Sequence, residues 1–218
     1  MDSLPLLRLL TWLSPAFPTG AFAYSHGLEW SVETGDVADE ASLIAWLQDT
    51  LAHGGLWSDV LFLRHAHRAD PEHLPALAEL ATALAPSSER RLETLAQGAA
   101  FRQAATPWPA SALTNWGDAP LPYCIAVGVL ASSQGVAEDE AAIAYLHAAT
   151  ANFISAAIRL IPLGQMAGLR VQAAIEADSL AAAEASRAAG LDDLGTAAWA
   201  ADIAAMQHET QYTRLFRT

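Results

Sequence analysis

Apolar side chains recur at helical spacing along most of this chain. The apolar positions of one early segment are three or four residues apart: Leu43, Trp46, Leu47 and Leu51. The next segment, from Trp57 to Leu63, repeats that spacing, which places apolar side chains on one face of an α-helix. Gly54 and Gly55 separate the two segments, so we predict a helical hairpin.

The same reasoning extends to most of the remaining sequence. A further helix is predicted to begin between Pro71 and Pro75 and to end at Pro86. Others are predicted from about 88 to 105, 121 to 135, 138 to 160, 164 to 177, 179 to 189 and 195 to 208. Four prolines interrupt residues 106–122, and no helix is expected to run through them. Strand-like alternation is scarce. We therefore predict an all-α fold over residues 1–218, a single helical bundle-like domain of roughly eight to ten helices.

Composition removes several classes of function. The 218 residues are 53% hydrophobic and 16% charged, which excludes a disordered chain. The formal net charge of −13 argues against nucleic acids and anionic membranes as partners. No uncharged apolar run reaches the length of a bilayer span, and the N-terminus does not resemble a signal peptide. We expect a cytoplasmic protein.

The residue types that are missing limit the chemistry further. All eleven basic residues are arginines, so the chain has no lysine for a P-loop or a Schiff base. Cys124 is the only cysteine and lies in an apolar run, as a buried small residue would. The seven histidines form no metal-binding spacing, and His26 with Glu29 is the best candidate catalytic pair. We expect no catalytic site, no bound metal and no cofactor.

The last thirteen residues, Met206 to Thr218, have an unusual composition for a chain end. They interleave apolar and guanidinium side chains, types that dominate binding hot spots: Tyr212, Arg214, Leu215, Phe216 and Arg217. Two interpretations stay open. The segment folds back onto its own domain, or it is held for another protein.

Residues 14–30 form a second unusual segment. Pro15, Pro18 and Gly20 predict a fixed irregular turn, which presents several aromatic rings: Phe17, Phe22, Tyr24, His26 and Trp30. A packed loop with buried rings is one interpretation. A rigid recognition surface is the other, because rings held by proline and glycine lose little entropy on binding.

Small residues also mark one face of the helix predicted at 138–160. Ala148, Ala149, Ala156 and Ala157 would allow another helix to approach closely. The sequence does not decide whether that seam lies within the chain or between subunits.

These segments together resemble the urease accessory protein UreF family. Its members carry an SPA-x-P-x-G-x-[FY]-x-[YH]-S-x-GLE stretch, matched by residues 14–29, and a PLGQ element, matched by residues 162–165. They end in a M-x-HE-x-x-YSRLF-x-S tail, matched by residues 206–218 with Thr213 and Thr218 in place of serine. Residues 122–135 match the family's central helix more loosely. Met166 to Leu169 depart from the more polar run that related chains often have.

The resemblance implies a dimeric all-α scaffold without catalytic activity of its own. Such proteins bind UreD (UreH in some species), recruit the GTPase UreG, dock on the urease apoprotein and help to deliver nickel. It also implies partner-binding residues in the two motifs: Phe22, Tyr24, His26, Glu29, His208, Glu209, Tyr212, Arg214, Leu215, Phe216 and Arg217. We hypothesise that the tail is loosely held alone, lies beside the loop around Tyr24, and becomes fixed against UreD.

Other functions stay open from the residues alone. One of the eleven arginines could act on GTP bound to UreG, but the sequence does not select which. The histidines would suit a nickel-binding metallochaperone, although no spacing forms a site. An apolar helix at 121–135 could border a pocket in a helical ligand-binding protein.

Overall fold

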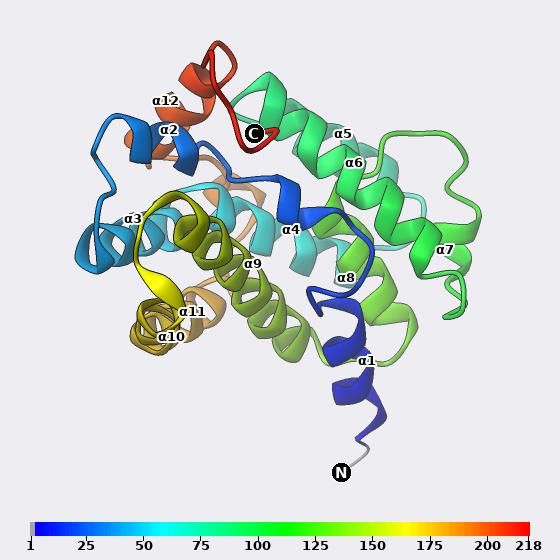
Figure 1. The fold of residues 1–218 in the computed structure, drawn as a ribbon. Helices are drawn as coiled ribbons and strands as arrows, with labels where there is room; N and C mark the ends of the chain where they lie inside the picture. Colours follow the sequence, from blue (N-terminus) through cyan, green and yellow to red (C-terminus); the bar gives the residue numbers. More distant parts are fainter. Residues whose placement is uncertain (1–2) are drawn as a thin grey trace.

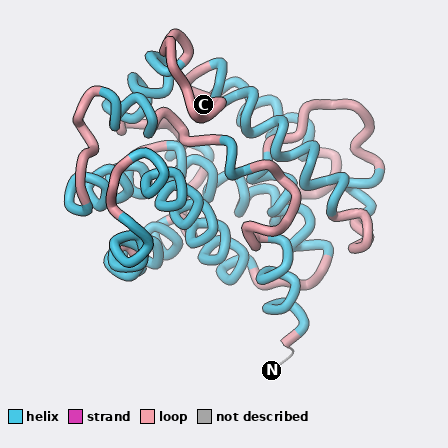
Figure 2. The backbone as a smooth tube through the Cα atoms, in the orientation of Figure 1, coloured by secondary structure: helices cyan, strands magenta, loops and turns pink. Residues whose placement is uncertain are grey.

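Helices follow one another along the whole described part of the chain, residues 3–218, and no strand occurs there (Figures 1 and 2). The computed structural model contains ten helices of nine residues or more, in agreement with the predicted fold class. They are α1 (Leu4–Trp12), α3 (Glu40–His53), α4 (Gly55–Arg68), α5 (Leu74–Ala83), α6 (Ser88–Ala104), α8 (Tyr123–Ser133), α9 (Glu138–Leu160), α10 (Gly164–Ala174), α11 (Glu176–Ala185) and α12 (Trp199–His208). The shorter elements are α2 (Leu28–Glu33), α7 (Ser111–Thr114) and the 3₁₀ turns η1 (Ala21–Ala23) and η2 (Leu191–Asp193).

Local sequence accounts for where several helices begin. The Asp39 carboxylate accepts a hydrogen bond from the Ser42 backbone N–H at 2.8 Å, and the Ser42 hydroxyl lies 3.1 Å from the Asp39 backbone nitrogen. This reciprocal arrangement is a capping box, and it starts α3. The Ser87 hydroxyl accepts from the Arg90 backbone N–H at 3.1 Å and starts α6 in a simpler way.

Helix α8 forms the centre of the bundle, as its apolar sequence predicts. All residues from Cys124 to Ala131 are buried, and α8 packs against α4 and α6. Gly128 allows the closest approach, because a Cβ atom there would lie 2.3 Å from the Leu63 carbonyl oxygen of α4. A side chain at this position would force the two helices apart.

Helix α9 crosses the front of the bundle in Figure 1 and contacts helices on several sides, including α2, α4 and α11. Its 23 residues are long and apolar enough to cross a membrane by length and composition alone, which corrects the expectation that no apolar run reaches that length. Half of the apolar stretch is buried inside the protein, however, as in the core helix of a folded domain. Ala156 and Ala157 belong to this buried face, so that part of the predicted small-residue seam lies within the chain.

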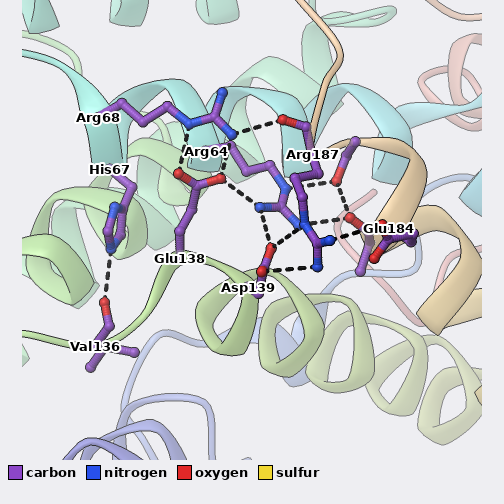
Figure 3. Close-up of polar contacts among 10 residues, drawn as sticks. Arg64, His67, Arg68, Val136, Glu138, Asp139, Glu184 and Arg187 are labelled. Carbon is purple, nitrogen blue, oxygen red and sulfur yellow. Dashed lines mark hydrogen bonds and ion pairs between the residues drawn. The ribbon is translucent and has the colours of Figure 1, made fainter.

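A buried arginine ties three helices together beside this core (Figure 3). Arg64 of α4 is 1% exposed, and its guanidinium donates to Glu138 at 2.5 Å and Asp139 at 2.8 Å, at the start of α9. It also donates to the Ala183 carbonyl at 2.7 Å and the Ser186 hydroxyl at 2.8 Å, at the end of α11. The cluster therefore links α4 to the start of α9 and to the end of α11 through hydrogen bonds and ion pairs.

The structure corrects three details of the predicted helices. The last helix begins at Trp199 rather than near 195, because the backbone N–H groups of residues 197 and 198 donate to the His53 carbonyl instead. Residues 106–122 contain the single helical turn α7. The boundary predicted near 178 lies between α10 and α11 at Ile175.

Candidate partner-binding site

The loop before α2 has a backbone that its sequence specifies. Gly20 and Gly27 take left-handed φ values of 76° and 79°, and His26 has φ of 58°, the only positive value at a non-glycine residue in the described part. At Gly27 a Cβ atom would lie 2.5 Å from the Ala205 backbone nitrogen. Glycine therefore lets α2 approach α12 closely and brings the loop against the C-terminal segment.

Glu29 of α2 holds the C-terminal tail, residues 209–218. Its buried carboxylate accepts hydrogen bonds from the backbone N–H groups of Leu215 at 2.6 Å and Phe216 at 2.9 Å. A carboxylate that accepts backbone N–H groups makes strong, charge-assisted hydrogen bonds. Glu29, which the sequence offers as one half of a candidate catalytic pair, is thus bound to the backbone of the tail.

His208 lies between two carboxylates and is completely buried. Its Nε2 is 3.1 Å from Glu29 and its Nδ1 is 2.6 Å from Glu89 of α6. Carboxylates only accept, so both contacts are hydrogen bonds when each ring nitrogen carries a proton. Arg214 reaches the other oxygen of Glu89 at 2.6 Å, which joins the tail to α6.

The end of the tail lies along the loop, and Figure 1 shows it returning beside α2 and α6. The Arg217 N–H donates to the Ala23 carbonyl and the Ser25 N–H donates to the Thr218 carbonyl, both at 2.8 Å. Phe216 and Thr218 are buried. The prediction that loop and tail are neighbours is confirmed. The hypothesis that the tail is loosely held is wrong, because these contacts fix it against its own domain.

A second buried group lies beneath the loop. The Glu93 carboxylate of α6 pairs with Arg90, contacts His26 Nε2 at 2.6 Å and accepts from the Thr218 hydroxyl at 2.8 Å. Burial opposes ionisation of Glu93, but the charges of Arg90 and His26 outweigh it and lower its pKa to about 2. Burial, reinforced by Arg90, lowers the pKa of His26 to about 4. At neutral pH His26 is therefore uncharged, and its Nε2 lies between Glu93 at 2.6 Å and the Arg90 guanidinium at 2.9 Å.

This arrangement predicts a loss of stability in mild acid. The unfolded chain takes up a proton on His26 near pH 6.5, whereas the folded chain does so only near pH 4, so stability falls as pH drops through that window. The expected loss is about 3 kcal/mol by pH 4. Urea unfolding at several pH values would measure it. His26→Asn, which tolerates the positive φ, should flatten this part of the profile. A variant with an unchanged slope would remove His26 as the cause.

Comparison with known proteins decides the family. A sequence model of the UreF family matches residues 37–176. A urease accessory protein UreF from Rhodopseudomonas palustris (strain BisB5) is 51% identical, over 100% of this chain and 93% of its own length. UreF proteins of Bradyrhizobium sp. (strain BTAi1) and Methylobacterium radiotolerans are 50% and 46% identical, over 100% of this chain and 94% and 98% of their own lengths.

The chain belongs to the UreF family. It is a urease accessory protein, a non-catalytic factor with a role in urease maturation, as the sequence resemblance implies. Within residues 3–218, no group of three or more His, Cys, Asp or Glu side chains is placed to hold a metal ion. The metallochaperone alternative therefore gains no support from the described structure.

The predicted partner-binding residues of this UreF-family chain differ in their exposure to solvent. Four are buried and hold the tail or the loop in place: Tyr24, Glu29, His208 and Phe216. His26 is partly buried. The exposed set is Phe22, Glu209, Tyr212, Arg214, Leu215 and Arg217. Glu209 caps α6 by accepting from the Ser88 N–H at 2.7 Å, so it too is engaged within the chain.

Three residues that complete the site were not found from the sequence. Glu89 and Glu93 are four residues apart on one face of α6, a spacing that could have indicated a paired role. Arg159 of α9 donates to the Phe22 carbonyl at 2.7 Å, and its guanidinium carbon lies 4.3 Å from the centre of the Phe216 ring. No sequence signal pointed to Arg159, because both its contacts are distant in the chain.

Proposed function

We propose that this chain is a urease maturation scaffold that bridges UreD (UreH) and the GTPase UreG on the urease apoprotein. In this proposal it gates GTP-dependent nickel insertion, and it acts as a homodimer in the cytoplasm. The exposed side chains of the tail and the loop form its contact surface for UreD. The observation that supports this surface is a tail whose backbone is hydrogen-bonded to its own domain while the side chains of Tyr212, Leu215 and Arg217 are exposed.

The exposed fractions carry this argument. Tyr212 is fully exposed, Phe22 is 73% exposed and Leu215 is 57% exposed. The apolar face of α12 adjoins the tail in sequence and is exposed too, with Trp199 at 70% and Ile203 at 54%. Contiguous exposed apolar residues on a folded protein mark interaction sites. Because the tail is already fixed, a partner loses little entropy in ordering it.

The basic side chains of this chain suit a scaffold that does not itself hydrolyse GTP. The chain has no lysine, so it cannot itself supply a P-loop. In the described part of the chain, nine arginine side chains form a hydrogen bond or an ion pair. The guanidinium groups of Arg91 and Arg217 form neither there. Arg217 lies between the buried Phe216 and Thr218, and its side chain is exposed. These two guanidiniums are the ones free to meet an anionic group of a partner.

Leu215→Asp should weaken the capture of UreD. Desolvating a charge in the centre of an apolar contact is costly, so we expect at least a ten-fold loss of affinity, about 1.4 kcal/mol or more. Leu180→Asp on α11 is the matched control, because Leu180 is 52% exposed and Leu215 is 57% exposed. Co-purification and calorimetric titration with purified UreD would measure the difference. Equal affinities for the two variants would exclude the tail as the contact surface.

A further inference from the structure

A cavity of about 150 Å³ lies beneath the loop that precedes α2. The loop, α4, α6, α8 and α9 surround it. Ala148 and Ala149 of α9 line the cavity, and their methyl groups are too short to fill it. This part of the small-residue face therefore borders a void rather than a helix seam. A cavity of this volume can hold an organic molecule of about six heavy atoms.

The charged side chains that line this cavity include more carboxylates than cations. Arg90 and Glu93 both line it and pair with each other, and His26 is neutral beside them. Glu93 is fully engaged, since the Gln97 amide also donates to it at 2.8 Å. Asp59 of α4 adds a further carboxylate to the wall. When Asp59 is ionised, one negative charge at the cavity has no counterion.

Asp59 has little support from the protein around it. The Tyr145 hydroxyl donates to its carboxylate at 3.0 Å, and the Cys124 thiol adds a weaker hydrogen bond. Within residues 3–218, no arginine or histidine forms an ion pair with it. Burial raises the pKa of Asp59, and the nearby charge of Arg90 offsets only part of this effect. Asp59 is half-buried and has no cationic partner of its own, because Arg90, the arginine that lines the cavity, already pairs with Glu93. A cation in the cavity would supply that partner.

The other residues in the wall indicate whether that cation is a metal ion or an organic molecule. Trp12, Leu56 and the alanines of α9 add apolar surface to the wall of the cavity. A metal ion does not fit, since the described residues offer no set of three ligating side chains. An anion would be repelled by Asp59, and Arg90 is not free to pair with it because its guanidinium already pairs with Glu93.

We propose that this cavity binds a small organic cation, a primary alkylammonium of up to about six heavy atoms. Its ammonium group pairs with Asp59, and its alkyl chain packs against Trp12 and Leu56. The inference stands apart from the proposed contact with UreD, because it concerns an internal site and a small molecule.

Titration with n-butylammonium, n-butanol and butyrate tests this proposal. We follow the indole N–H signal of Trp12 and the methyl signal of Ala148 by NMR. Butylammonium should bind saturably with at least a ten-fold lower Kd than the neutral alcohol, and butyrate should not bind. Equal binding of alcohol and ammonium, or no saturable shift at these two residues, would overturn the proposal and leave a cavity that holds only water.

Variants of the cavity wall sharpen the test. Asp59→Asn should weaken butylammonium binding at least ten-fold, whereas Asp36→Asn at an exposed carboxylate should leave it unchanged. Ala148→Leu should abolish binding by filling the space. This second variant decides the matter if Asp59→Asn does not fold. Wild-type affinity in Ala148→Leu would place the ligand elsewhere and refute the assignment.

Discussion

Glu29→Ala is expected to release residues 214–218 from the body of the protein while the helices stay folded. The substitution removes the acceptor of the Leu215 and Phe216 N–H groups and one of the two partners of His208. Hydrogen bonds to a charged group contribute about 1.5–3 kcal/mol each. The free energy of opening the tail should therefore fall by roughly 3–5 kcal/mol. Amide hydrogen exchange at Leu215 and Phe216 should accelerate by roughly a hundred-fold or more.

Glu33→Ala is the matched control for this experiment. Glu33 lies on the same helix, α2, but is exposed. Its removal should leave exchange in the tail unchanged. Protected amides at Leu215 and Phe216 in Glu29→Ala would show that Glu29 does not hold the tail. A released tail combined with unchanged capture of UreD would instead refute the proposed contact surface.

Arg64→Met should lower the free energy of unfolding by about 3 kcal/mol. The methionine side chain fills much of the same volume but cannot donate to the four groups at the ends of α9 and α11. The Ala183 carbonyl and the Ser186 hydroxyl, both in buried residues, would each lose their arginine donor. Urea denaturation followed by circular dichroism would measure the loss.

Arg187→Met provides the comparison, because Arg187 pairs with the same Asp139 carboxylate from an exposed position. Exposed ion pairs contribute about 0–1 kcal/mol, so this variant should unfold close to the wild-type midpoint. Similar losses in the two variants would mean that burial of Arg64 is not the origin of its effect.

The helical architecture could be predicted from the sequence because its signals are local. Apolar spacing and helix propensity act within a few turns, and the prolines of residues 106–122 interrupt them visibly. The central position of α8 followed from a helix that is apolar all round. The face of α12 shows the limit of this reasoning. The spacing of Trp199, Ile203 and Met206 puts them on one face of this helix, but spacing alone does not reveal that this face meets solvent.

The order of the tail could not be predicted for a different reason. The contact between Leu215 and Glu29 spans 186 residues of sequence, and that between Arg214 and Glu89 spans 125. Neither carboxylate belongs to a pattern that specifies its partner. The cavity could not be predicted from the sequence either, because Asp59 and Ala148 in its wall belong to separate helices, α4 and α9.

In the tail, backbone atoms bind the rest of the domain, whereas exposed side chains are the atoms available to a partner. Glu29 and Ala23 accept hydrogen bonds from the backbone N–H groups of residues 215–217, which every residue type except proline can donate. The outward side chains at 212, 215 and 217 can therefore be exchanged without loosening the segment that displays them. Partner preference in such a protein can change by substitution at a few surface positions, at almost no expense to the fold beneath.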